Sequence, residues 1–228
     1  MNIVEYTNKG RRPVNQDYLL HRILPDGTAI CILADGMGGY EHGEVASEVV
    51  SKAIARILES DSQGYSPADL LKEAVCRSND ALRAEQRRSG IECMGTVVTV
   101  LLLRGDEAYL SWLGDSRIYL FRNNKEIYRT DDHSVLNELS KERKLCEEDY
   151  QRYTSVVTRC IMGDDIVPDV PVEHLTTRPG DTFILCSDGF YNEVGMDIAR
   201  LYSPNEKEIL DDMSDMISDN YSFIRVDL

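Results

Sequence analysis

Five aspartates stand beside apolar stretches of this sequence, at the points where the stretches begin or end. Asp35, Asp115 and Asp188 follow such stretches, whereas Asp17 and Asp219 precede them. Each one taken alone has a simple explanation, because Asp-Gly and Asp-Asn pairs form turns. If the strand ends converge, however, the carboxylates repel one another and raise one another's pKa. Divalent cations resolve that conflict, and a cage of oxygen ligands favours Mg²⁺ or Mn²⁺ over zinc.

Four glycines fall within eight positions after Asp35, so other phosphate-binding loops have to be considered. A dinucleotide-binding fingerprint beginning at Gly36 needs glycine at Glu41, and a Walker loop needs a Gly-Lys-Ser/Thr tripeptide that the sequence lacks. A phosphatase with a nucleophilic aspartate in an Asp-x-Asp pattern needs aspartate at Met37. A metal site fits better: two ions that share a carboxylate bind phosphate oxygens and generate a hydroxide nucleophile near neutral pH.

The composition narrows the class of protein. The chain of 228 residues is long enough for one large domain with a sizeable core. Its formal net charge of -15 argues against nucleic acid or an anionic membrane as a partner, because both would be repelled. The six cysteines form no C-x-x-C pair, which indicates a reducing compartment without a disulfide framework. With no signal-peptide core and no apolar run of about 20 residues, we expect a cytoplasmic protein.

The surrounding patterns predict the elements that position these aspartates. The runs 18–24 and 28–34 flank the turn residues 25–27 and predict a β-hairpin. Helical periodicity begins at Gly43, and Ser66 followed by proline predicts the start of a second helix that ends at Gly90. A capping box at Ser203 predicts a late helix. Further strands are predicted at 96–103, 107–113, 117–122, 126–130, 182–187 and 221–226. Many antiparallel strands with helices on their faces indicate an α+β fold.

The order of motifs resembles the metal-dependent type 2C serine/threonine protein phosphatases (the PPM family) in their small bacterial form. The resemblance covers almost the whole chain and runs through "GRRPVNQD", "LADGMGG", "MGTVVTV", "WLGDSRIYLFR", "TDDHS", "VVTRCIMG", "CSDGF" and "SDNYSFI". It implies a four-layer α-β-β-α sandwich with two central, mainly antiparallel β-sheets flanked by helices. It also implies a single catalytic domain spanning residues 1–228, with a flap near residues 134–155.

The resemblance assigns a role to each aspartate. It implies that Asp35 bridges two Mn²⁺ or Mg²⁺ ions and that the Gly36 carbonyl binds one of them. Asp188 and Asp219 are implied ligands of the second ion. Asp17 would support the cluster through metal-bound water, and Asp115 matches the position that helps hold a third, weaker metal ion.

Arg12 matches the arginine that grips the substrate phosphate, a task suited to a guanidinium that makes bidentate contacts. Without the resemblance, Arg12 would be interpreted as one member of a solvated basic pair with Arg11. The implied reaction is a single in-line displacement at phosphoserine or phosphothreonine by hydroxide bridging the two metals. The implied partners are a phosphorylated protein and an opposing serine/threonine kinase in bacterial signalling, and we expect a monomer.

Departures from the family pattern leave alternatives open. Met37 stands where animal members carry histidine, and Gln16 stands where many members carry glutamate. These changes leave room for a catalytically weak phosphoprotein-binding regulatory module of the same fold. A phosphatase dedicated to one regulatory protein is a further alternative, which nothing in the sequence separates from a general antagonist of a serine/threonine kinase. His133 is a candidate for either a catalytic or a structural role. The flap, residues 134–155, is either a device for selecting the phosphoprotein or an ordinary exposed excursion.

Overall fold

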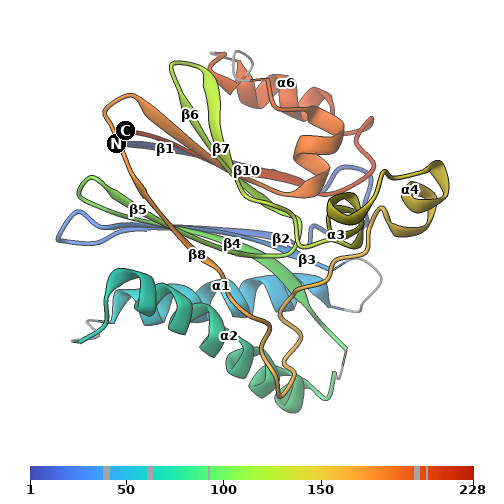
Figure 1. The fold of residues 1–228 in the computed structure, drawn as a ribbon, viewed down its shortest axis with the longest axis horizontal. Coiled ribbons are helices and arrows are strands. Elements are labelled where there is room, and N and C mark those ends of the chain that lie inside the picture. The colour runs from blue at the N-terminus through green and yellow to red at the C-terminus, as the bar shows by residue number, and fades with distance from the viewer. Residues whose placement is uncertain (38–41, 61–63, 92, 198–200, 204) are drawn as a thin grey trace.

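Two five-stranded antiparallel sheets lie face to face in the computed structural model, with helices on both outer sides (Figure 1). The structure describes residues 1–37, 42–60, 64–91, 93–197, 201–203 and 205–228. One sheet, here the β3 sheet, has the strand order β2-β3-β4-β5-β8, and the other, the β10 sheet, has the order β1-β10-β9-β6-β7. This is the predicted four-layer α-β-β-α sandwich.

The elements have the following bounds. The β3 sheet contains β2 (Asp17–Ile23), β3 (Ala29–Gly36), β4 (Thr96–Arg104), β5 (Glu107–Leu113) and β8 (Val172–Thr176). The β10 sheet contains β1 (Asn2–Asn8), β6 (Arg117–Arg122), β7 (Lys125–Arg129), β9 (Asp181–Cys186) and β10 (Tyr221–Asp227). The helices are α1 (Gly43–Glu59), α2 (Pro67–Ser89), α3 (Val135–Glu142), α4 (Glu147–Tyr153), α6 (Glu206–Asp212) and the π-helical turn η1 (Phe190–Val194).

Local signals specify the hairpin and the two long helices as predicted. Strands β2 and β3 pair antiparallel, and α1 begins at Gly43. At the start of α2, the Ser66 side chain accepts a hydrogen bond from the Asp69 N–H, and Pro67 occupies the first turn. Gly90 ends this helix with a φ of 74°, a conformation that glycine adopts without a Cβ penalty.

The capping box predicted at Ser203 is wrong. Helix α6 begins after Asn205, whose side chain makes no capping hydrogen bond. Glu206, the acidic member of the expected box, is instead buried and accepts a hydrogen bond from Arg225 on β10 at 3.1 Å. A tertiary ion pair thus takes the carboxylate that local sequence assigned to the cap; Pro204 lies outside the described residues.

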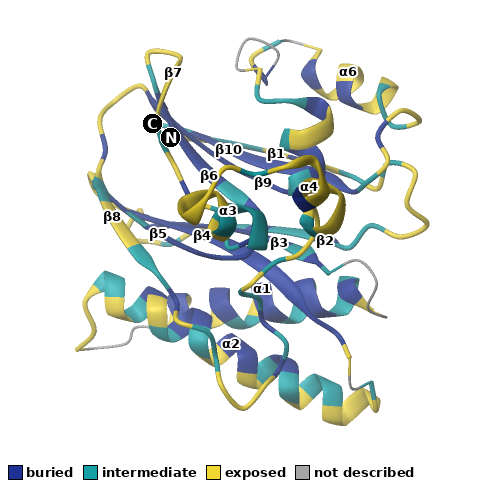
Figure 2. Cartoon of the chain, turned by 45° about the vertical axis from the view of Figure 1, so that its right-hand side comes forward, coloured by how far each residue is buried: buried dark blue, intermediate teal, exposed yellow. Residues whose placement is uncertain are grey.

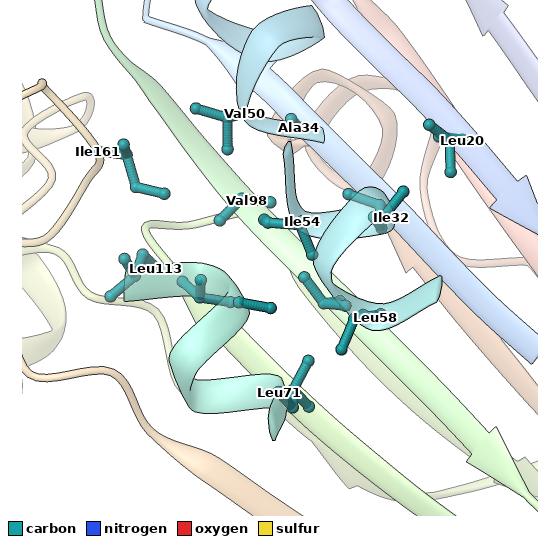
Figure 3. Packing of buried hydrophobic residues seen from close by; sticks show 14 of the residues in the cluster. Leu20, Ile32, Ala34, Val50, Ile54, Leu58, Leu71, Val98, Leu113 and Ile161 are labelled. Atoms are coloured by element: carbon teal, nitrogen blue, oxygen red, sulfur yellow. The ribbon is translucent and has the colours of Figure 1, made fainter. Parts of the chain in front are cut away.

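Apolar layers fill the spaces on both sides of the β3 sheet (Figures 2 and 3). Side chains alternate along a strand, so Ile30 and Ile32 pack against α1 and α2, while Cys31 and Leu33 face the β10 sheet. Asp35 continues the second series, which places its carboxylate at the edge of the space between the sheets. The first layer includes the labelled residues of Figure 3, among them Leu20, Ala34, Val50, Ile54, Leu58, Leu71, Val98, Leu113 and Ile161.

Candidate metal centre

The β3 sheet contributes two of the five aspartates. Asp17 at the start of β2 lies directly opposite Asp35 at the end of β3, so the hairpin places both carboxylates on one face. The Thr96 hydroxyl at the start of β4 donates a hydrogen bond to the Asp35 carbonyl oxygen at 2.7 Å. The neighbouring strand therefore fixes the backbone that carries Asp35.

The β10 sheet contributes two more. Asp188 follows β9, Asp219 precedes β10, and these two antiparallel strands are neighbours, so both residues lie at the same end of the sheet. The backbones touch at this point, because a Cβ built on Gly189 would lie 2.2 Å from the carbonyl oxygen of Asn220. Only glycine fits beside Asp188.

Asp115 lies in the short link between β5 and β6, where the chain crosses from the β3 sheet to the β10 sheet. The carboxylates therefore come from both sheets and from the connection between them. Asp35, Asp115, Asp188 and Asp219 line one cavity of about 280 Å³. The cavity is also lined by Arg12, Gln16, Gly36, Met37, Val97, Ser155, Val157 and Asn220.

Asp17 lies behind this cavity rather than in its wall. Its Oδ2 accepts a hydrogen bond from the Ser187 hydroxyl at 2.9 Å, while its buried Oδ1 has no hydrogen-bond partner among the described residues. A buried carboxylate oxygen without a partner is costly. This position suits the supporting role that the resemblance implies.

Burial and mutual repulsion raise the pKa values of the clustered carboxyl groups. Burial, followed by repulsion from the neighbouring carboxylates, raises the pKa of Asp17 to about 7 and that of Asp35 well above its usual value. Burial and the charge of Asp188 raise the pKa of Asp115 to about 7. Burial and the charge of Asp219 raise the pKa of Asp188 to about 6. The site therefore concentrates more negative charge than the protein alone neutralises at neutral pH.

Arg12 supplies one positive charge to this cluster. Its Nε and Nη2 donate hydrogen bonds to the two carboxylate oxygens of Asp219, both at 2.8 Å. This bidentate pairing turns the Asp219 carboxylate towards the arginine. Among the described residues, no three acidic, histidine or cysteine side chains lie close enough together to form a metal site without rearrangement. Arg12, the candidate for binding phosphate, is thus in direct contact with Asp219, a candidate metal ligand.

The residues present fit a hard divalent cation. The cavity wall offers several carboxylates and the Gly36 backbone, which are oxygen ligands of the kind that Mg²⁺ and Mn²⁺ prefer. The unpartnered Oδ1 of Asp17 and the raised pKa values both indicate that positive charge is needed here. Asp219 can join the ligand set once Arg12 releases it.

Glycine at position 36 is required by packing. A Cβ on Gly36 would lie 2.4 Å from the carbonyl carbon of Gly43 at the start of α1, so no larger residue fits. The Gly36 N–H donates to the carbonyl oxygen of Gln16 at 3.0 Å, and the Ser47 hydroxyl binds the same oxygen at 2.7 Å. Gln16 thus joins β3 to α1 through its backbone. Gly38 and Gly39, the other glycines of this stretch, lie outside the described residues.

His133 packs against the end of β5 and the residue that follows it. Its ring stacks on Trp112 with 5.6 Å between ring centroids, and its Nδ1 accepts a hydrogen bond from the Gly114 N–H at 3.3 Å. Burial lowers the pKa of His133 to about 4, so the ring is neutral near pH 7. His133 is absent from the residues that line the cavity. Between the two roles left open by sequence, this geometry favours the structural one.

Three contributors to the site lie outside the residues that the sequence analysis assigned to it. Asn220 accepts a hydrogen bond from the Gln16 N–H and donates to the carbonyl oxygens of Lys9 and Val14, so it holds the loop that carries Arg12. Ser155, the last residue of the flap, and Val157, just beyond it, also line the cavity. Asn220 is adjacent to Asp219 in sequence, which was the one available signal.

The sequence matches the protein phosphatase 2C family over residues 8–221. It is 32% identical over 200 residues to the protein phosphatase PhpP of Streptococcus pneumoniae, an alignment that covers 85% of this chain and 80% of the relative. The chain belongs to the protein phosphatase 2C family. It is also 34% identical over 171 residues to the serine/threonine protein phosphatase PstP of Mycobacterium tuberculosis, which covers 74% of this chain.

The match spans about a third (33%) of the length of that mycobacterial protein phosphatase 2C relative. A crystal structure of M. tuberculosis PstP superposes with a TM-score of 0.82 at 29% identity, covering 100% of this chain and 98% of that one. The PstP catalytic domain in complex with two manganese ions gives a TM-score of 0.79 at 28% identity and covers 99% of this chain and 97% of that one. Similarity to a two-manganese protein phosphatase 2C structure agrees with the predicted cofactors.

Proposed function

We propose that this chain is a metal-dependent phosphatase that hydrolyses phosphoserine and phosphothreonine in proteins. The observation that carries the proposal is the convergence of four aspartates from both sheets and their crossover around one cavity, with Arg12 in the same wall. The names of the relatives, which are serine/threonine phosphatases, support the substrate class. The proposed partner is a phosphorylated protein, produced by an opposing serine/threonine kinase.

Each residue has a proposed role that follows from its position. Asp35 and the Gly36 carbonyl would hold one ion, and Asp188 and Asp219 would join Asp35 in holding the second. Two such ions supply a hydroxide nucleophile at neutral pH and positive charge for the phosphate oxygens. Asp17 supports the cluster from behind, and Asp115 is the proposed ligand of a third ion.

Arg12 would orient the substrate. Its guanidinium already makes a two-pronged contact with a carboxylate, and the same fork fits two oxygens of a phosphate. Met37, which lines the cavity, has a thioether without an exchangeable proton, so it does not protonate the leaving group. The residues of this chain therefore hold the metal ions and position the phosphate, and no cysteine nucleophile is required.

Among the described residues, none of the helices combines the length and the apolar composition needed to span a bilayer. We further propose that residues 1–228 act as one catalytic domain with residues 134–155 as its flap, and that the protein works as a cytoplasmic monomer. Gel filtration with light scattering at micromolar concentration measures the molar mass in solution and so tests whether the protein is a monomer.

The test of the activity is phosphate release from a phosphothreonine peptide by purified protein with Mn²⁺, with Mn²⁺ plus excess chelator, and by Asp35→Asn with Mn²⁺. We expect release only from the metal-loaded wild type. Phosphopeptide binding without phosphate release by metal-loaded protein would instead support the regulatory binding module.

A further inference from the structure

Arg117, the first residue of β6, makes contacts in three directions from a half-buried position. Its Nε and Nη2 donate hydrogen bonds to the two carboxylate oxygens of Asp132, both at 2.7 Å. Its Nη1 donates to the Tyr119 hydroxyl at 3.2 Å, and its guanidinium lies 3.6 Å from the ring centroid of Tyr191. The side chains of this ion pair are only 21% and 18% exposed, so water weakens it less than it would a surface pair.

The partners of Arg117 belong to separate parts of the site. Asp132 lies on the segment that leads into the flap, and its carbonyl oxygen accepts a hydrogen bond from the Asn137 side chain in α3 at 2.7 Å. Tyr191 lies in η1, three residues after Asp188, and its hydroxyl donates to the backbone carbonyl oxygen of Asp115 at 3.1 Å. One guanidinium therefore connects the flap to the two segments that carry Asp115 and Asp188.

A second cavity, of about 380 Å³, lies against this network. Arg117, Asp132 and Tyr191 line it together with flap residues that include Asn137, Ser140 and Tyr150. It shares Asp115 and Asp188 with the first cavity, so the two spaces adjoin. Peptide that continues beyond a phosphate held in the first cavity has this polar space open to it, with the flap as one wall.

We propose that Arg117 is a positioning residue that fixes the flap relative to the metal-bearing segments and so sets the shape of the second cavity for the polypeptide around the phosphorylated residue. The proposal rests on the proposed function. Arg117 acts through Asp132 and Tyr191 and does not touch the reacting phosphate. Its loss widens and loosens the peptide-binding wall while Asp35, Asp188 and Asp219 keep their own strand-end supports.

The chain contains a matched control at the other end of the same strand. Arg122, the last residue of β6, also makes a bidentate pair with a buried aspartate, Asp181, with both hydrogen bonds at 2.6 Å. It is absent from the residues that line either cavity. Substitution by lysine keeps the charge in both places and removes the fork, so Arg117→Lys and Arg122→Lys make the same chemical change with and without contact to the site.

The experiment compares the two variants with the wild type, using a phosphothreonine peptide and p-nitrophenyl phosphate. We expect Arg117→Lys to raise the KM for the peptide roughly tenfold, the scale of a lost charge-assisted hydrogen bond, with kcat for the small ester nearly unchanged. Arg122→Lys should lower thermal stability without changing either KM. An equal change in peptide KM for both variants, or a fall in kcat on both substrates with peptide KM unchanged, overturns the proposal.

Hydrogen exchange of the metal-free proteins separates this inference from the proposed function, because it requires no turnover. Arg117→Lys should speed amide exchange in residues 134–155, whereas Arg122→Lys should leave that segment as in the wild type. Unchanged flap exchange in Arg117→Lys overturns the positioning role even if the enzyme is active. A wild type that releases no phosphate while flap exchange responds to Arg117→Lys refutes the phosphatase assignment and leaves the mechanical connection standing.

Discussion

The carboxyl group of Asp35 shows how a single residue ties stability to function. It is surrounded by Asp17, Asp115, Asp188 and Asp219, and burial with this repulsion raises its pKa. Without metal ions, the folded protein holds protons that the unfolded chain releases near pH 4, the ordinary range of aspartate. Folding stability therefore falls as pH rises from about 4 to about 7 through the raised pKa values of these groups.

The variant Asp35→Asn tests whether the free energy of unfolding falls as pH rises in this way. Protonated aspartate resembles asparagine, so in chelator the variant should approach the wild type at about pH 4 and below and should be more stable than the wild type near pH 8. His133, with its lowered pKa, acts in the opposite direction, but it contributes equally to both proteins and cancels in the difference. Urea unfolding across this pH range provides the free energies, and a wild type that gains on the variant as pH rises contradicts the prediction.

The ion pair between Arg12 and Asp219 makes a second prediction at the residue scale. Because the guanidinium occupies both oxygens of Asp219, a metal ion has to displace it. Arg12→Ala should therefore bind Mn²⁺ several-fold more tightly while losing affinity for phosphate.

Arg11→Ala is the control for this prediction, because it removes the same charge from the neighbouring residue, whose side chain makes no hydrogen bond or ion pair among those found in the described chain. Calorimetric titration with Mn²⁺ measures the Mn²⁺ affinity of each variant and of the wild type. If the two variants gain equally, the effect is general electrostatics and the competition is absent.

At the scale of elements, local chemistry explains what sequence could predict. The β2–β3 hairpin, α1 and α2 follow from turn residues, a cap and apolar periodicity within a few positions. Strands β1 and β8 were missed, since both lie at sheet edges, only Tyr6 of β1 is buried, and no residue of β8 is fully buried. The start of α6 was placed wrongly because Arg225 on β10, 19 positions further along the chain, binds the Glu206 carboxylate in place of the cap.

The same distinction applies to the site. All five strand-end aspartates could be identified from residue type and position, because a carboxylate beside an apolar strand is visible locally. The pairing of Arg12 with Asp219 and the anchoring of its loop by Asn220 could not, since both join residues about two hundred positions apart. Contacts of that range depend on the strand order, which no local pattern contains.

The flap is the element whose removal should separate substrates. Helices α3 and α4 join at a tip that Arg143 and Asp149 close with two hydrogen bonds of 2.6 Å. Replacing residues 143–149 with Gly-Ser-Gly should lower kcat/KM for a phosphoprotein well below its effect on p-nitrophenyl phosphate, because only the larger substrate reaches the flap. Equal losses on both substrates would show that the segment supports the metal centre instead of selecting the protein.

At the scale of the whole molecule, the proposed metal centre would join the two sheets. Its carboxylates lie in β2 and β3 on one side, and just after β9 and just before β10 on the other. Metal binding to the folded state alone therefore stabilises the sandwich. At a free Mn²⁺ concentration 100 times the dissociation constant, the gain is about 2.7 kcal/mol, or a rise in Tm of roughly 5–10 °C for a chain of this size.

Calorimetry with Mn²⁺ and with chelator measures this shift. The net charge of -15 also attracts cations without a specific site, so Asp35→Asn serves as the control for general binding. The expected result is a large shift in the wild type and a small one in the variant. Equal shifts in the two proteins would mean that the strand-end aspartates do not form the stabilising site.

The strand order has a consequence for biosynthesis. The first strand, β1, lies at the edge of its sheet and pairs with β10, the last strand of the described chain. On the ribosome, β1 therefore remains without its partner until β10 has been made, and Asp219 reaches the site only shortly before that. A chain that stops before Asp219 therefore has neither the partner of β1 nor the complete set of candidate metal ligands.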